Sequence, residues 1–307
     1  MLYTQAVRVN MAQKNFSLVS PNLSKNSEQK LAQGPSTTGF IKDILSRSGE
    51  IKDQVIVIKL PSVVISNDAL LTSFSENVHL ISTCGAKVAI VHDHTNLVSD
   101  TLKLIGFDEK LIDNIIVVDH KSAQIIEMVI SGYINKLIVS KLSNLGCLAV
   151  GISGKDGNLI QAKKTKLVHK KDNSKVIDIG FVSEPVMFNP EILFNFEENN
   201  IIPVISPIAS DLNGCTHILD VNTTASIVSF ALDADHLMFL DDKTIFKENY
   251  ARIYDIQPLQ KMQNKQKQNP KTLSIIRAAI SSLENGNNCV HFVNAENPDS
   301  LLLSIFL

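Results

Sequence analysis

The chain has 307 residues and a formal net charge of -2, with 44% hydrophobic and 20% charged residues. This is the balance of a globular protein with a sizeable core. It lacks the basic excess typical of nucleic-acid binders, so we expect no nucleic-acid partner. No apolar run reaches the roughly 18 residues that a membrane span needs, so we expect no membrane association. The cysteines form no CxxC pair, which argues against a metal site and favours reduced thiols in a cytoplasmic protein.

Residues 1–38 are polar, rich in Ser, Asn and Gln, and without sustained periodicity. We predict that this extension is disordered. A short amphipathic helix should follow, because Phe40, Ile41, Ile44 and Leu45 form one apolar stripe at helical spacing. We assign residues 39–307 to one folded domain, with an N-lobe at about 54–186 and a C-lobe at about 187–307.

From Gln54 onward, short β-branched runs alternate with longer helical patterns. The runs predict strands at Val55–Lys59, Lys87–His92, Ile115–Asp119, Leu148–Ile152, Ile202–Ser206, His236–Leu240 and Cys289–Val293. Helices are predicted at about 67–83, 97–105, 121–144, 189–199, 222–233 and 271–285, several of them ending at a glycine. This alternation predicts an α/β fold, an open and mostly parallel three-layer αβα sandwich. The alternating, Lys-rich stretch 158–186 predicts a projecting β-hairpin.

Ligands of open α/β sheets usually bind beyond the carboxyl ends of the strands. The segments expected there are Leu60–Ser62, Asp93–Thr95, Gly151–Gly157, Pro207–Ser210 and Asp241–Thr244. Candidate functional residues are therefore expected in these segments.

Several segments resemble the acetylglutamate kinases of the amino acid kinase family. The most specific are AVGISGKDGNLI (149–160) and DIGFVSEPVMFNPEIL (178–193), and VIVIK (55–59), KVAIVH (87–92) and DVNTTAS (220–226) add to them. The matching segments extend over roughly residues 54 to 306. The resemblance implies the amino-acid kinase fold and transfer of the ATP γ-phosphoryl group to the carboxylate of N-acetyl-L-glutamate, a step of arginine biosynthesis that needs Mg²⁺.

The resemblance also implies roles for individual residues. Lys59 and Lys271 match two catalytic lysines, which is chemically sensible because phosphoryl transfer depends on charge neutralisation. Substrate-binding positions hold His94, Thr95, Asp220 and Asn222, and nucleotide-binding positions hold Ser62 and Asp242. Plain structural interpretations stay open: Lys59 as a strand-end lysine, His92 as a packed strand-end histidine, and Asp241-Asp242 as a solvated turn.

The sequence departs from the family at its phosphate loops. Pro61 and Ser62 stand where the family has two glycines, and proline offers no N–H to a phosphate. Asp93, His94 and Thr95 replace three glycines, and Asp93 places a carboxylate where phosphate and substrate should approach. Two unit charges about 5 Å apart at an effective dielectric near 20 repel by roughly 3 kcal/mol.

Three further departures affect the substrate and the lysines. Ile116 replaces an arginine that grips the substrate carboxylate, Asp220 replaces an asparagine, and Thr224 replaces the aspartate that organises the two lysines. Losing a single preorganised donor typically costs about 10²–10³ in rate. We therefore predict lost or strongly reduced catalysis. The alternative is an active ATP-dependent kinase that uses Lys59 and Lys271 on a different small acid.

The predicted ligands and partners depend on whether the chain is an inactive family member or an active kinase. An active enzyme would use ATP and Mg²⁺, whereas an inactive chain would need neither, and the expected ligand is a small acid or a nucleotide. We expect a homo-oligomer: a dimer through the helical region 121–144, and a larger assembly if the helix near 40–47 also pairs. That helix could instead cap its own sheet.

Overall fold

The computed structural model describes residues 42, 45–107, 110–112, 115–168, 176–241, 245, 249–264 and 269–307. Residues Ile44–Leu307 form one compact unit. The predicted disorder of residues 1–38 lies outside the described residues, as does half of the helix predicted near 40–47, of which residues 42 and 45–47 are described and helical. Among the described residues, no helix is both long enough and apolar enough to cross a membrane.

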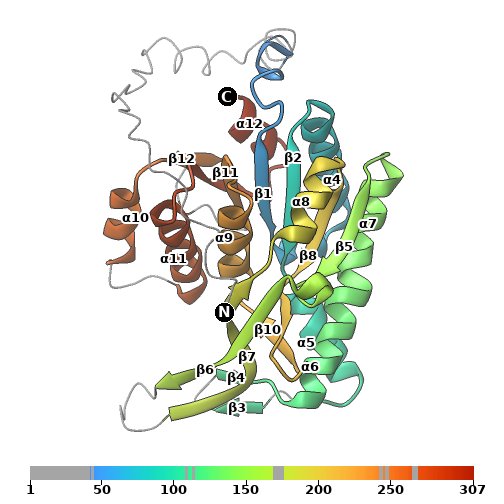
Figure 1. Ribbon diagram of the computed structural model, residues 1–307, viewed down its shortest axis with the longest axis vertical. Helices are drawn as coiled ribbons and strands as arrows, with labels where there is room; N and C mark the ends of the chain where they lie inside the picture. The colour runs from blue at the N-terminus through green and yellow to red at the C-terminus, as the bar shows by residue number, and fades with distance from the viewer. Residues whose placement is uncertain are drawn as a thin grey trace, which may run out of the picture. The chain divides into compact units, whose positions relative to one another are not determined.

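A seven-stranded sheet forms the centre of this unit (Figure 1). Its order is β12-β13-β11-β1-β2-β8-β5, and every pair is parallel except β12–β13. The strands are β1 (Val55–Leu60), β2 (Lys87–His92), β5 (Ala149–Ser153), β8 (Ile202–Ser206), β11 (His236–Asp241), β12 (Tyr250–Ile253) and β13 (Cys289–Asn294). The predicted parallel α/β sheet is therefore confirmed.

Helices cover both faces of the sheet because its central strands are apolar on both faces. Successive strand residues point to opposite faces, so Ile56 and Ile58 belong to one buried cluster, whereas Val55 and Val57 belong to a second. The first cluster includes α3 (Ser62–Ile65), α4 (Asp68–Thr83), α5 (Thr95–Leu104), α6 (His120–Glu127), the π-helix η1 (Met128–Ile134), α7 (Asn135–Asn144) and α12 (Ser300–Phe306). The second includes α8 (Glu191–Glu198), α9 (Val221–Ala231), α10 (Ile256–Gln263) and α11 (Pro270–Glu284).

Local sequence signals fix the ends of these helices. The Asn67 side chain accepts hydrogen bonds from the backbone N–H groups of Ala69 and Leu70 at the start of α4, as an N-cap does. Gly85 follows the C-cap residue of the same helix with a φ of 93°, a conformation that glycine adopts readily. The predicted boundaries of this helix are thus confirmed within a residue.

A smaller closed barrel lies beside the sheet, in the order β10-β7-β6-β9. Its strands are β6 (Ile160–Val168), β7 (Val176–Phe188), β9 (Ile208–Ser210) and β10 (Thr216–Leu219). The antiparallel β6–β7 pair confirms the hairpin predicted for residues 158–186. The short strands β9 and β10 were not predicted.

One predicted strand of the main sheet is placed elsewhere. Within Ile115–Asp119, strand β4 (Ile115–Val117) pairs antiparallel with β3 (Lys110–Ile112) in a separate two-stranded sheet. Val118 then forms an isolated bridge with Gly180 of β7. A short apolar run predicts a strand but does not reveal its partner, so its assignment to the parallel sheet was wrong.

Candidate functional site

The carboxyl edge of the parallel sheet brings together several of the candidate residues. Lys59 lies one residue before the end of β1, beside Val91 of β2 and Phe239 of β11. It is only 4% exposed. Pro61 follows the strand as the N-cap of α3 and makes no side-chain cap bond, and Ser62 is the first residue of that helix. The Lys59 side chain therefore lies buried at the edge where ligands of this architecture bind.

His92 ends β2 and belongs to a buried polar network. Its Nε2 lies 3.1 Å from Ser206 Oγ at the end of β8 and 3.3 Å from Nδ2 of Asn135, the first residue of α7. The Asn135 amide also donates to the Val204 carbonyl at 2.8 Å. Burial lowers the pKa of His92 to about 4, although the bond to the Asp93 carbonyl opposes this shift. His92 is therefore neutral near pH 7 and joins two strands to a helix.

Asp93 and His94 occupy the turn between β2 and α5. The Asp93 Oδ1 accepts a 2.7 Å hydrogen bond from the His94 backbone N–H and lies 3.5 Å from His94 Nδ1. Burial lowers the pKa of His94, while the carboxylates of Asp93 and Asp220 act in the opposite direction. The space between this pair and Ser62 does not hold a water-sized molecule. Thr95 begins α5, and its side chain lies outside the described residues.

Asp220 and Asn222 lie at the start of α9. Asp220 caps the helix: its Oδ1 accepts from the Thr223 N–H at 2.8 Å and its Oδ2 accepts from the Ser274 hydroxyl at 3.1 Å. Asn222 donates to Ser274 Oγ at 3.0 Å, while its buried Oδ1 has no partner among the described residues. Thr224 is fully buried and donates to the Asp220 carbonyl. The N-terminus of α9 and helix α11 thus meet through Ser274.

A sequence model of the amino acid kinase family matches residues 54–294. The chain belongs to the amino acid kinase family. It is acetylglutamate kinase-like within that family: the acetylglutamate kinase of Archaeoglobus fulgidus is 32% identical over 275 residues, which are 87% of this chain and 92% of that enzyme. The Campylobacter hominis acetylglutamate kinase is 31% identical over 84% of this chain and 89% of its own length.

Solved structures of lower identity share the fold. The N-acetylglutamate synthase from Neisseria gonorrhoeae, complexed with coenzyme A and N-acetyl-glutamate, matches with a TM-score of 0.73 at 18% identity over 88% of this chain. The match spans 61% of the synthase, less than two thirds of its length. The carbamate kinase from Giardia lamblia bound to AMP-PNP has a TM-score of 0.57 at 12% identity over 81% of this chain and 96% of its own.

In helix α11 of this family member, the residue that contacts α9 is not the lysine to which the sequence resemblance gives a role. Lys271 lies in the first turn of α11 with an exposed side chain. Ser274, one turn later, is the residue that contacts Asp220 and Asn222. The sequence did not identify Ser274, because the family resemblance gives a role to Lys271. Which residue of the helix faces α9 depends on how the helix is rotated about its axis, and only the structure shows this. Asp242 lies outside the described residues.

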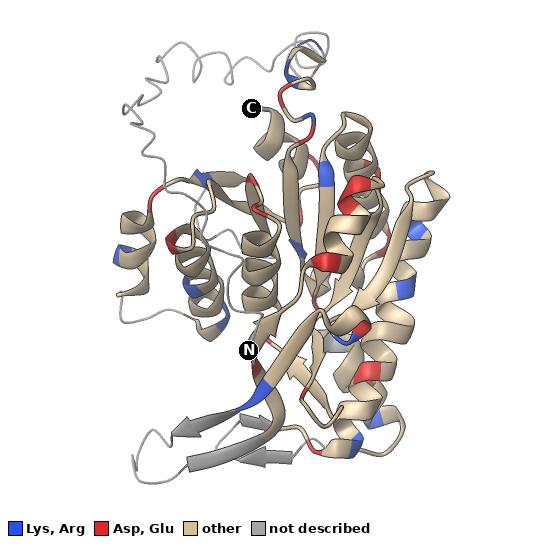
Figure 2. Ribbon diagram, in the orientation of Figure 1, with Lys and Arg blue, Asp and Glu red and all other residues tan. Residues whose placement is uncertain are grey.

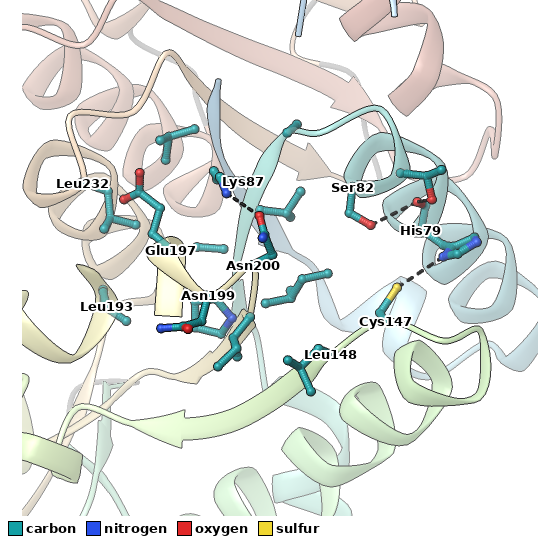
Figure 3. Close-up of a pocket in the computed structure, with 18 of the residues that line it drawn as sticks. His79, Ser82, Lys87, Cys147, Leu148, Leu193, Glu197, Asn199, Asn200 and Leu232 are labelled. Atoms are coloured by element: carbon teal, nitrogen blue, oxygen red, sulfur yellow. Dashed lines mark hydrogen bonds between the residues drawn. The ribbon is translucent and has the colours of Figure 1, made fainter. Parts of the chain in front are cut away.

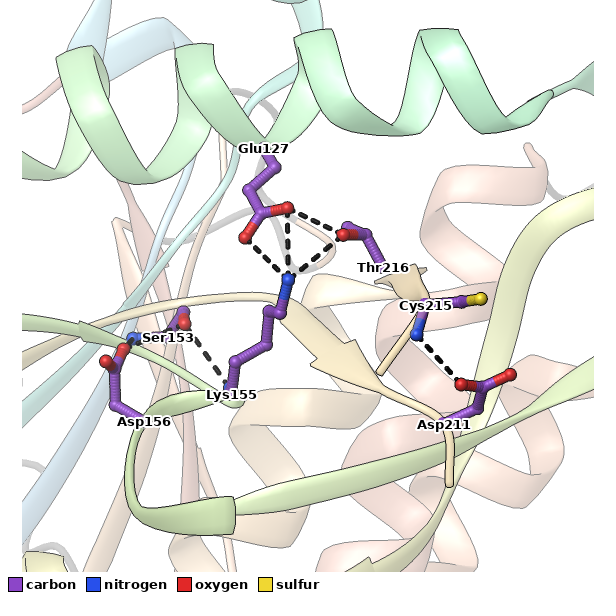
Figure 4. Close-up of polar contacts among 7 residues, drawn as sticks. All are labelled: Glu127, Ser153, Lys155, Asp156, Asp211, Cys215 and Thr216. Carbon is purple, nitrogen blue, oxygen red and sulfur yellow. Dashed lines mark hydrogen bonds and ion pairs between the residues drawn. The ribbon is translucent and has the colours of Figure 1, made fainter. Parts of the chain in front are cut away.

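The family-typical segment Val150–Ile160 forms a strand and a tight loop that are fixed to neighbouring elements. Figure 4 shows the Lys155 ammonium between the Glu127 carboxylate, at 3.0 and 3.2 Å, and the Thr216 hydroxyl, at 3.1 Å. Asp156 closes the loop by accepting from the Ser153 N–H at 2.7 Å and from its hydroxyl at 2.8 Å. These contacts join the end of β5 to α6 and β10. The segment therefore holds the scaffold beside the site.

A cavity of about 330 Å³ lies at the opposite, amino edge of the sheet (Figure 3). Lys87, the first residue of β2, donates there to the Asn200 side chain. Cys147 Sγ lies 3.6 Å from His79 Nδ1 at the other end of the cavity. Because these residues precede the strands or begin them, the cavity is separate from the carboxyl-edge site.

Charged residues of both signs are interspersed over the elements drawn in Figure 2.

Proposed function

We propose that this acetylglutamate kinase-like chain keeps the family fold but has lost most or all of the family activity. That activity is the ATP-dependent phosphorylation of the N-acetyl-L-glutamate carboxylate. The observation that carries this proposal is the Asp93–His94 pair. It occupies the turn where the family has glycines, with side chains that are 15% and 21% exposed, and leaves no water-sized space toward Ser62. A phosphate would meet a carboxylate and an imidazole instead of free backbone N–H groups.

The surroundings of Lys59 support the same proposal. Within the described part of the chain, Lys59 forms no ion pair. Thr224, at the position of the organising aspartate, is an uncharged and fully buried residue whose hydroxyl bonds within its own helix. ATP and Mg²⁺ would be the cofactors of an active enzyme. The residues fit a triphosphate poorly, because Pro61 has no N–H to donate and Asp93 places a carboxylate in the neighbouring turn.

A second candidate is a kinase that acts on a different small acid. It is favoured by the same buried Lys59, because a buried ammonium without an anionic neighbour is costly and an anionic ligand would offset that cost. Among the described residues the Asn222 Oδ1 has no partner, so it is free to accept a hydrogen bond from a hydroxyl or N–H group of such a ligand.

Calorimetric titration with Mg·ATP and an ATP-turnover assay test both candidates. The panel of acceptors contains N-acetyl-L-glutamate and other small carboxylic acids. We expect neither tight ATP binding nor turnover with N-acetyl-L-glutamate. Turnover with that substrate at a rate ordinary for kinases would contradict the first candidate, and turnover with another acid alone would establish the second.

A reverted variant tests the cause of the loss. It combines Pro61→Gly, Asp93→Gly, Ile116→Arg and Thr224→Asp, and we expect it to gain measurable turnover with N-acetyl-L-glutamate. Its matched control carries Lys59→Met in addition and should lose whatever activity is gained. A folded variant without any gain would show that these four positions do not explain the lack of activity.

We also propose that the protein is a homodimer formed through α6, η1 and α7. Met128 and Tyr133 of this helical segment are 71% and 59% exposed, and large apolar side chains on one exposed surface favour an interface. Further assembly through the helix near 40–47 remains a proposal. The free cysteines support a reducing compartment, and we propose the cytoplasm.

A further inference from the structure

Three side chains that suit a metal ion converge at the amino ends of β11 and β13, on the edge opposite the candidate kinase site. We propose that His236, Cys289 and His291 bind one divalent transition-metal ion of the zinc class. Imidazole nitrogen and thiolate sulfur are the ligands that such ions prefer. The proposal is independent of whether the chain transfers phosphate.

The sheet itself places the three side chains together. Cys289 and His291 are two residues apart in β13, so their side chains point to the same face. His236 lies directly beside Cys289 in the parallel register of β11 and β13, and therefore shares that face. All three donor atoms lie within 4.8 Å of one another. Cys289 is 2% exposed and His291 is fully buried.

The two imidazole rings contact each other through one nitrogen each and contact an oxygen group through the other. His236 Nδ1 and His291 Nε2 face each other at 2.9 Å, while the outer nitrogens lie 3.0 Å from Gln54 Oε1 and 2.7 Å from Ser304 Oγ. Metal-bound histidines almost always use the other ring nitrogen in such a bond to oxygen. Tetrahedral coordination with bonds of about 2.0–2.1 Å would set the two nitrogens roughly 3.3 Å apart, so a small opening of the rings admits the ion.

The thiol must lose its proton to bind. Burial raises the pKa of Cys289 to about 11, while the Tyr254 hydroxyl and the Arg252 guanidinium act in the opposite direction. Metal binding forms the metal–sulfur bond and releases the thiol proton to solvent. Cys289 and His291 are buried and the neighbouring Tyr254 is 66% exposed, so the proposal rests on the three protein ligands and leaves the fourth position of a tetrahedral ion to a small exogenous ligand.

Arg252 opposes the bound cation and at the same time favours the thiolate. Its Nε donates to the Ser304 carbonyl at 2.8 Å, and one of its terminal nitrogens is buried without a partner among the described residues. A thiolate beside this guanidinium would supply an anion that the metal-free cluster lacks. The Asp235 carboxylate acts electrostatically on His236. The thiolate and this carboxylate together offset much of the added positive charge.

Cobalt(II) titration of the metal-free, untagged full chain tests the site directly. We expect binding of one equivalent, with a thiolate-to-cobalt charge-transfer band and the visible bands of tetrahedral coordination, and displacement by zinc. Cys289→Ser should abolish the charge-transfer band. Cys84→Ser, at a half-buried thiol after α4, is the matched control and should keep both the band and the affinity. Gln54→Leu, which removes only the acceptor behind His236, should weaken binding about 10–100-fold.

Two results would overturn the proposal: no thiolate-to-cobalt band in the wild type, or an unchanged band in Cys289→Ser. Circular dichroism establishes that each variant folds. If Cys289→Ser does not fold, His236→Asn replaces it, and the proposal then requires that this variant loses the tetrahedral bands. Zinc should also raise the Tm of the wild type, because an ion that binds only the native state stabilises it, and the chelated protein should lose that increment.

Discussion

Buried histidines govern how the protein responds to acid. Burial lowers the pKa of His92 to about 4 and lowers the pKa values of His94, His236 and His291 as well. The unfolded chain takes up a proton on each histidine near pH 6.5, whereas the folded chain does so only at lower pH. Stability is therefore complete above about pH 6.5 and falls as the pH drops toward the folded values, by up to about 1.4 kcal/mol per pH unit for each histidine.

His92→Gln should reduce this acid sensitivity. In the wild type, His92 accounts for roughly 3 kcal/mol of the free energy of unfolding that is lost between about pH 6.5 and 4. The stability of the variant should therefore fall less steeply with pH. At neutral pH the variant should be less stable than the wild type, because the bonds to Ser206 and Asn135 are lost. Urea unfolding between pH 7.5 and 4.5 in the presence of a chelator measures both the stability at neutral pH and its fall toward acid pH. His120→Gln, at an exposed position of α6, is the control and should retain the wild-type fall. Equal slopes in all three proteins would contradict the assignment.

At the level of elements, sequence periodicity predicted the strands whose formation depends on the local pattern of residues. Val55–Lys59 and Cys289–Val293 lie in strands of the main sheet, because β-branched runs of this length fit a strand buried on both faces. Ile115–Asp119 was placed in the wrong sheet, because pairing partners are chosen by tertiary packing. For the same reason the sequence did not reveal Ser274 facing α9, or the pairing of His236 beside Cys289 that a search for CxxC spacing misses.

Gly180 shows how closely the barrel and the β3–β4 ribbon approach each other. It has a φ of +78°, and a Cβ there would lie 1.9 Å from the Val118 carbonyl oxygen. Gly180→Ala should cost about 1–2 kcal/mol for the left-handed backbone and a further 1–3 kcal/mol for the overlap. Gly214 has the same φ but no neighbour within 4 Å of its Cβ position, so Gly214→Ala should show only the first cost. Urea unfolding of both variants measures the difference, and equal losses would mean that the Val118 contact is unimportant.

At the level of the whole molecule, the fold was predictable from the sequence, whereas the packing around the candidate site was only partly so. Strand–helix alternation and the resemblance of segments such as Val150–Ile160 predicted the α/β architecture, in which Lys155 of that segment pairs with Glu127 of α6. The sequence identified Pro61 and Asp93 as replacements of glycine. It could not predict that His94 and Ser62 line the same narrow groove, since this depends on how α3 and α5 pack.

The proposed dimer is a property of the complete molecule that the exposed helical face makes testable. The π-helix bonds of η1 link residues five apart, so Met128 and Tyr133 lie close to one turn from each other, and both are exposed. Burying them against a second copy removes apolar surface from water at about 25 cal/mol per Å². A glutamate at each position would instead bring like charges together across a two-fold axis, where one patch meets its own copy.

Met128→Glu combined with Tyr133→Glu should therefore convert the dimer into a folded monomer, which sedimentation equilibrium at several protein concentrations would detect. Phe230→Glu is the matched control, because Phe230 is a 54% exposed aromatic residue at the end of α9, away from this helical segment. It should leave the dimer intact. A wild-type chain that sediments as a monomer would contradict the dimer itself. A double variant that stays dimeric would move the interface to another surface, such as the edge of the seven-stranded sheet at β5, which Leu148, 59% exposed, directly precedes.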